Sequence, residues 1–189
     1  MLYSGDEVGQ LNDYTYKENP SKAVDSRYLH RGAFQWEAAD KCKLGIKLYQ
    51  GNEILFHDEL CEGVDSGRIS RMNNTDYVLV EFMPSDPYQY IRNSLDEIMS
   101  EGYQPIIAHV ERYGCMLDDV ENVREIKNMG VEIQVNASSI LGDIGRDVKK
   151  FLHKLLSEQI IDYVGTDAHR CEGSRTPTIR ECVGMLYKK

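Results

Sequence analysis

The chain has 189 residues, of which 41% are hydrophobic and 28% are charged, and its formal net charge is −9. It contains no apolar run near the roughly 18 or more residues that a transmembrane helix needs, so we expect no membrane insertion. Because nucleic acids and anionic membranes reward clustered Lys and Arg, the acidic balance argues against both as partners. The start of the chain, MLYSGDEVGQ, lacks the basic and apolar regions of a signal peptide, which predicts a soluble, cytoplasmic protein.

The five cysteines are scattered along the chain, and no two of them form a C-x-x-C pair. We therefore expect neither a disulfide framework nor a structural zinc site. The sequence also lacks the C-x5-R loop with which cysteine-based phosphatases hold a phosphate around a thiolate. Any phosphate chemistry would need a different type of site.

Strand-like and helix-like segments alternate from about residue 45 onward. Apolar runs predict strands at 46–54, 76–82, 105–110, 131–137 and 160–166. Helical periodicity, twice followed directly by a glycine, predicts helices at 88–101, 117–129, 146–158 and 179–188. The order β-β-α-β-α-β-α-β-α predicts an α/β fold, with a parallel sheet or barrel and outer helices.

Polar side chains are placed at the ends of all these strands. The strands end in, or are followed by, Glu53, Glu81, His109, Asn136 and the pair Asp167 and His169. Parallel strands bring their carboxyl ends to one edge, where a barrel carries its chemistry. Because buried carboxylates without partners are costly, residues of this kind gathered at one edge favour a shared metal site.

The ligand types narrow the choice of metal and of reaction. Carboxylates mixed with imidazoles and no thiolate suit Mn, Fe or Zn, whereas an all-oxygen shell would favour Mg or Ca. Two or three ions bridged by a carboxylate can lower the pKa of a water and hold both ends of an in-line displacement at phosphorus. Arg112 follows His109 by three residues, and a guanidinium can hold two phosphoryl oxygens at once. The pattern therefore predicts hydrolysis of a phosphate ester.

The motifs around these residues carry a family resemblance. They are GNEI at 51–54, LVEF at 79–82, PIIAHVERY at 105–113, KNMG at 127–130, VNASS at 135–139 and TDAH at 166–169. Together they resemble the manganese-dependent protein-tyrosine phosphatases of the bacterial PHP (polymerase and histidinol phosphatase) superfamily, which are associated with capsule and exopolysaccharide synthesis. The spacing agrees with this, because Glu53 to Glu81 and Glu81 to His109 are each 28 residues, as one strand-to-strand repeat would give.

The resemblance implies a fold and a first set of metal ligands. The fold is a distorted (β/α)7-type PHP barrel with parallel strands and outer helices, its catalytic portion spanning residues 45–189. In such a site Glu53 bridges two metals, Glu81 and His109 complete one of these metal sites, and Asp167 belongs to the other.

The resemblance also implies the remaining parts of the site and its substrate. His169 would ligate a third ion, and Arg112 would bind the phosphate. The substrate would be phosphotyrosine, typically on the tail of a bacterial tyrosine kinase that drives polysaccharide export. The nucleophile would be a metal-bound hydroxide, with His109 and Arg112 as the catalytic residues. The metal would be Mn, with Fe or Zn as alternatives, and a homo-oligomer stays open.

The amino-terminal segment, residues 1–44, departs from the family pattern. Family members open with a His-x-His strand and an Asp-rich turn, whereas residues 1–29 contain no histidine. His30, in YLHRGAF, resembles the second histidine motif of the family and is a candidate ligand. The segment fits a fragment or mis-started reading frame, a paralogue that has lost a metal, or a divergent member with replacement ligands. In each case the barrel is expected to be incomplete at its amino terminus.

Two classes of function follow. In the first, the chain is a metal-dependent protein-tyrosine phosphatase that acts on a kinase of polysaccharide synthesis. In the second, it is a remnant that binds a metal or a phosphotyrosine tail without turning it over. A small-molecule phosphatase of the histidinol-phosphate type is an alternative within the enzyme class.

Overall fold

The computed structural model describes residues 18, 20, 51–168 and 179–187. The chain divides into two compact units, one of Tyr49–Gly165 with Thr178–Lys189 and the other of Met1–Leu48 with Thr166–Pro177. The first unit contains the elements described below. The predicted boundary between residues 44 and 45 stays a prediction.

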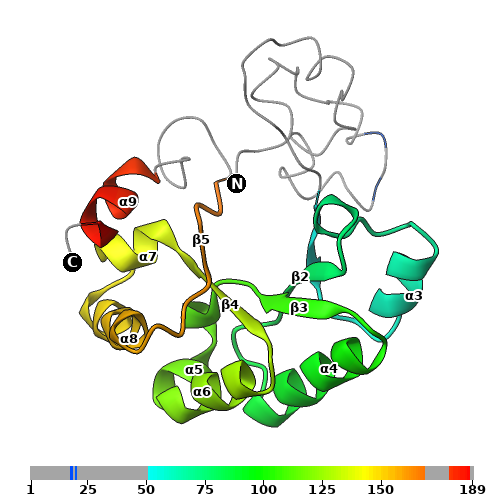
Figure 1. The fold of residues 1–189 in the computed structure, drawn as a ribbon, viewed down its shortest axis with the longest axis horizontal. Coiled ribbons are helices and arrows are strands. Elements are labelled where there is room, and N and C mark those ends of the chain that lie inside the picture. The colour runs from blue at the N-terminus through cyan, green and yellow to red at the C-terminus, as the bar shows by residue number, and fades with distance from the viewer. Residues whose placement is uncertain (1–17, 19, 21–50, 169–178, 188–189) are drawn as a thin grey trace. The chain divides into compact units, whose positions relative to one another are not determined.

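The described residues alternate between strands and helices (Figure 1). The strands are β1 (Glu53–Leu55), β2 (Tyr77–Glu81), β3 (Gln104–Ile107), β4 (Glu132–Asn136) and β5 (Tyr163–Gly165). The α-helices are α3 (Leu60–Asp65), α4 (Tyr88–Ser100), α5 (Gly114–Asp118), α6 (Val120–Asn128), α7 (Ala137–Leu141), α8 (Arg146–Ser157) and α9 (Arg180–Leu186). Two single 3-10 turns are η4 (Met72–Asn74) and η5 (Val110–Arg112).

The five strands form one sheet in the order β1-β2-β3-β4-β5, and every neighbouring pair is parallel. Each connection therefore runs in the same direction across the sheet, and right-handed crossovers then place the connecting helices on one face. Figure 1 shows the helices on the outer side of the curved row of strands. The predicted α/β fold with parallel strands and outer helices is confirmed.

The two faces of the sheet differ in what they bury. The helix-covered face carries the main core, to which Ile54, Val80, Ile107, Ile133 and Val135 contribute from the strands. Helix α4 reaches this core through Ile91, Leu95 and Ile98, which helical periodicity places on one side. The opposite face carries a small cluster of Leu79, Ile106 and Ala108. Because side chains alternate along a strand, Glu81 lies on this second face with Leu79.

One predicted helix, at 117–129, is wrong as a single element. The chain forms α5 and α6 instead, separated by Asp119, whose backbone is extended (φ −144°, ψ 110°). The Asp119 carboxylate accepts a hydrogen bond from the Glu121 N–H at 2.9 Å. Capping of this kind favours a new helix start over continuation of the old helix. Within the described part of the chain, no helix is long and apolar enough to cross a membrane.

Candidate metal centre

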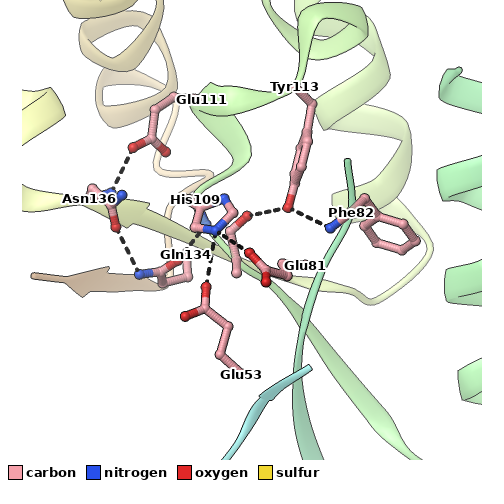
Figure 2. A network of polar contacts seen from close by, with 9 residues as sticks. Glu53, Glu81, Phe82, His109, Glu111, Tyr113, Gln134 and Asn136 are labelled. Atoms are coloured by element: carbon pink, nitrogen blue, oxygen red, sulfur yellow. Dashed lines mark hydrogen bonds and ion pairs between the residues drawn. The ribbon is translucent and has the colours of Figure 1, made fainter. Parts of the chain in front are cut away.

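Two carboxylates and one imidazole converge at the edge formed by β1, β2 and β3 (Figure 2). His109 Nε2 lies 3.0 Å from Glu53 Oε1 and 3.2 Å from Glu81 Oε2. The ligand atoms of the three residues all lie within 4.8 Å of one another. Among the residues that the structure describes, no other group of three or more His, Cys, Asp or Glu side chains meets this condition.

The sheet register brings Glu53 beside Glu81. Glu53 pairs with Leu79, and both face the same side as Glu81, two residues further along β2. The prediction that Glu53 ends its strand is wrong, because β1 begins at Glu53 and ends at Leu55. The strand starts no earlier because Asn52 bonds to Ser70 instead of the sheet: its N–H donates to the Ser70 carbonyl at 3.2 Å, and its Oδ1 accepts from the Ser70 N–H at 2.7 Å.

His109 reaches the carboxylates from a left-handed turn that follows β3. Its backbone has φ 34° and ψ 56°, a conformation that costs a residue other than glycine about 1–3 kcal/mol. The Arg112 N–H donates to the His109 carbonyl at 2.9 Å, and the His109 N–H donates to Gln134 Oε1 from β4. These contacts offset the cost and turn the imidazole back over the sheet edge.

The Gln134 side chain can lie where it accepts from the His109 N–H because β5 has a glycine beside it. Gly165 pairs with Asn136, and a Cβ at Gly165 would collide with the Gln134 side chain. The Gln134 amide also lies 3.5 Å from Asn136 Oδ1, with Nε2 as the donor. A glycine in β5 is therefore part of what places the His109 backbone.

The charge balance of the cluster favours a bound cation. Burial alone lowers the pKa of His109, but hydrogen bonds to Glu53 and Glu81 raise it, and the net value is about 9. Without a metal, a proton on His109 thus joins the two carboxylates. A divalent ion is a suitable replacement for this proton, because carboxylate and neutral imidazole donors match Mn, Fe and Zn. The three residues present therefore fit a metal.

Glu111 is a buried carboxylate that is not among the site residues predicted from the sequence. Its Oε1 accepts from the Asn136 N–H at 3.0 Å and from Ser139 Oγ–H at 2.6 Å. Its Oε2 is buried without a hydrogen-bond partner within the described residues, and burial raises the pKa of Glu111. Glu111 therefore ties the turn after β3 to the junction of β4 and α7, as Figure 2 shows for Asn136.

Tyr113 ties the same turn to β2. Its hydroxyl donates to the Ala108 carbonyl at 2.8 Å and accepts from the Phe82 N–H at 3.2 Å. The side chain is fully buried, and burial raises the pKa of its hydroxyl well above the ordinary value. The one sequence signal for Glu111 and Tyr113 is the crowding of polar residues in AHVERY directly after a strand.

The other predicted site residues stand as follows. Arg112 ends η5 and is half-buried, and its positive charge lowers the pKa of His109. Asp167 follows β5 by two residues with a left-handed φ of 48°, and belongs to the other compact unit. His30 and His169 lie outside the described residues. The ligand roles of these residues and the phosphate-binding role of Arg112 stay predictions.

The described cysteines do not offer a thiolate nucleophile. Cys61, Cys115 and Cys182 are free, and burial raises the pKa of each thiol. A raised pKa keeps a thiol protonated, and the thiolate is the reactive form. The chemistry of the described site is that of carboxylates and imidazole.

Known proteins resemble this chain in both sequence and fold. The family described as "Capsular polysaccharide synthesis, CpsB/CapC" matches residues 15–189. A putative tyrosine-protein phosphatase CapC of Staphylococcus aureus is 38% identical over 128 residues, which cover 67% of this chain and 50% of that protein. The tyrosine-protein phosphatase CpsB of Streptococcus agalactiae serotype V is 30% identical over 201 residues, covering 97% of this chain and 82% of that protein.

A solved structure agrees with these relatives. It comes from crystal structures of YwqE from Bacillus subtilis and CpsB from Streptococcus pneumoniae, described as unique metal-dependent tyrosine phosphatases. The TM-score is 0.71 at 26% identity, and the match covers 81% of this chain and 64% of that one. With motifs, fold and relatives in agreement, the chain belongs to the CpsB/CapC family of capsular polysaccharide synthesis, whose compared members are named tyrosine-protein phosphatases.

Proposed function

We propose that this chain hydrolyses phosphotyrosine in proteins at a metal centre that includes Glu53, Glu81 and His109. The convergence of these three ligand atoms, two of them at or just after the carboxyl ends of β2 and β3, carries the proposal. Similarity to proteins named tyrosine-protein phosphatases supports the reaction, and similarity to metal-dependent enzymes supports the cofactor.

Each residue of the proposed site has a task. Glu53 and Glu81 supply negative charge for the cations, and His109 supplies a neutral nitrogen once it has lost its proton. When bound, ions of this kind activate water and neutralise the charge that develops on a transferring phosphoryl group. Arg112 holds two phosphate oxygens and orients the phosphorus toward the metal edge. Asp167, His169 and His30 complete the ligand set in this proposal, with Mn as the metal.

The family description also supports a partner. Because the family is one of capsular polysaccharide synthesis, we propose the phosphotyrosine tail of a tyrosine kinase of that process as the substrate.

The absence of histidine from residues 1–29 favours a second candidate, a chain that binds a phosphotyrosine tail or a metal without turnover.

The test is hydrolysis of a phosphotyrosyl peptide by the full chain, after chelation and again after addition of Mn²⁺. We expect turnover that needs Mn²⁺, and a loss of about 100-fold or more in kcat/KM for Arg112→Ala, because charge stabilisation of the transition state is removed. His109→Ala should lose both turnover and bound Mn²⁺. Arg68→Ala is the matched control, since Arg68 is exposed and pairs with Glu62.

Different outcomes separate the candidates. Full activity in Arg112→Ala would exclude the proposed phosphate clamp. Binding of the peptide without turnover in the Mn²⁺-loaded chain would favour the non-catalytic candidate. Faster hydrolysis of histidinol phosphate than of the peptide would favour a small-molecule phosphatase.

A further inference from the structure

The hydroxyl of Tyr113 lies between the two strand ends that carry Glu81 and His109 (Figure 2). The Phe82 N–H donates to Tyr113 Oη at 3.2 Å, and Tyr113 Oη donates to the Ala108 carbonyl at 2.8 Å. Phe82 directly follows Glu81, and Ala108 directly precedes His109. A single oxygen atom therefore joins the backbone beside one candidate ligand to the backbone beside the other.

This oxygen continues the pairing of β2 with β3 beyond the point where direct pairing stops. The last paired residues are Val80 and Ile107, and the Ala108 N–H still donates to the Val80 carbonyl at 2.8 Å. The next two groups that face each other across the strands, the Phe82 N–H and the Ala108 carbonyl, meet through the Tyr113 hydroxyl. The spacing of the strand ends thus depends on a side chain.

The Tyr113 ring also contacts a residue at each of the two strand ends. Its centroid lies 5.8 Å from that of the His109 imidazole and 6.1 Å from that of the Phe82 ring. The Tyr113 side chain is fully buried, so these contacts are made in a packed interior where a small shift is felt by the neighbours.

We propose that Tyr113 is a positioning residue for the metal centre: its hydroxyl sets the distance between the strand ends that carry Glu81 and His109, and so the convergence of their ligand atoms. This inference rests on the proposed metal centre and names a residue outside its ligand set. Metal ions hold their ligands within about 0.2 Å of preferred distances, so a small change in spacing lowers affinity. Residues that orient metal ligands typically change metal affinity by about 10- to 100-fold when they are replaced.

The test compares Tyr113→Phe with Tyr77→Phe in the full chain. Tyr113→Phe removes only the bridging oxygen and keeps the ring. Tyr77 begins β2, at the opposite end from Glu81, and its hydroxyl donates to Glu132 at 3.3 Å. Both variants therefore lose one buried or half-buried tyrosine hydroxyl from the same sheet, but only one loses it beside the cluster.

Three measurements are made on each protein: the Mn²⁺ dissociation constant by calorimetry, the visible spectrum of the Co²⁺-loaded chain, and the amide hydrogen exchange of Phe82 without metal. We expect Tyr113→Phe to weaken Mn²⁺ binding about 10- to 100-fold, to alter the Co²⁺ spectrum and to speed exchange at Phe82. Tyr77→Phe should match the wild type in all three. The Co²⁺ spectrum reports ligand geometry, which a loss of stability alone would leave unchanged in the folded fraction.

Two results would overturn the positioning role. One is wild-type Mn²⁺ affinity and an unchanged Co²⁺ spectrum in Tyr113→Phe. The other is an unprotected Phe82 amide in the wild type, a measurement that does not depend on the folding of any variant. A wild-type chain that protects Phe82 but binds no Mn²⁺ would instead refute the proposed metal centre, and the positioning role with it.

Discussion

Within the turn that follows β3, neighbouring residues fix the site from different directions. His109 turns toward Glu53 and Glu81, Glu111 turns toward β4, and Tyr113 turns back to β2. The chain changes direction here at each step, because His109 is left-handed, η5 covers Val110–Arg112 and Tyr113 is extended. Five consecutive residues thus connect three strands and leave one imidazole at their common edge.

The buried carboxylate of Glu111 gives a prediction for stability. Glu111→Ala leaves the Asn136 N–H and the Ser139 hydroxyl without their acceptor, at a cost of about 1–3 kcal/mol for each buried group. Glu111→Gln keeps an acceptor oxygen and should cost less. Urea unfolding at pH 7 measures the difference, with Glu97→Ala on the exposed side of α4 as the control. Equal losses in the Ala and Gln variants would contradict this account.

The stability difference between the wild type and Glu111→Gln should also depend on pH. Burial raises the pKa of Glu111 above its ordinary 4.5, so the folded chain binds this proton more tightly than the unfolded chain. The free energy of unfolding of the wild type should therefore fall, relative to Glu111→Gln, as the pH rises above 4.5 toward the folded pKa.

At the scale of elements, long segments with a clear apolar pattern are predictable from sequence, except where a cap such as Asp119 starts a new helix, and short ones are not. The predicted helix 88–101 corresponds to α4 at Tyr88–Ser100, and the predicted strand 76–82 contains β2 at Tyr77–Glu81. Helix α3 has six residues and η4 has three, which is too short for a period to appear in the sequence. Strand β1 begins at Glu53 and leaves out residues 51 and 52 of the predicted strand, because hydrogen bonds between Asn52 and Ser70 replace sheet pairing there.

The same limit applies to the site. Glu81 and His109 are predictable because parallel strands bring equivalent ends together. Glu53 is predictable as a ligand type, but it begins β1 and comes near Glu81 through its pairing with Leu79. Gln134 and the partners of Glu111 are not predictable, because they meet the turn only through the register of β4. No local pattern encodes that register.

Helix α6 gives a prediction at this scale. Asp119→Ala removes the side chain that caps the Glu121 N–H and should lower the free energy of unfolding by about 1 kcal/mol. Asp119→Asn is the matched control, because its amide oxygen keeps the acceptor. Thermal unfolding of both variants measures the effect, and equal stability of the Ala and Asn proteins would show that the cap contributes nothing.

For the whole molecule, metal binding and stability should be coupled. An ion that binds only the folded chain stabilises it by mass action, by about 2.7 kcal/mol at 100 times the dissociation constant. We therefore expect Mn²⁺ to raise the unfolding temperature of the chelated chain in a concentration-dependent way. His109→Ala should lose most of this increase, and an equal increase in that variant would place the bound ion elsewhere.

The pH should modulate this coupling with a definite sign. In the metal-free chain the pKa of His109 is about 9 against an ordinary 6.5, so its contribution to stability is complete below pH 6.5 and is lost as the pH rises toward 9. The same proton competes with the metal. The increase in unfolding temperature caused by Mn²⁺ should thus grow between pH 6.5 and 9, and a pH-independent increase would argue against His109 as a ligand.

Because strands that are neighbours in the sheet are also neighbours in the chain, the order of the sheet is the order of synthesis. Residues 53, 81 and 109 lie in three successive repeats, so β1, β2 and β3 can pair before β4 has left the ribosome. Contacts between segments close in sequence also form faster than distant ones, because less loop entropy is lost. The two carboxylates and the imidazole can therefore meet early, and β4 then arrives with Gln134 to secure the His109 backbone.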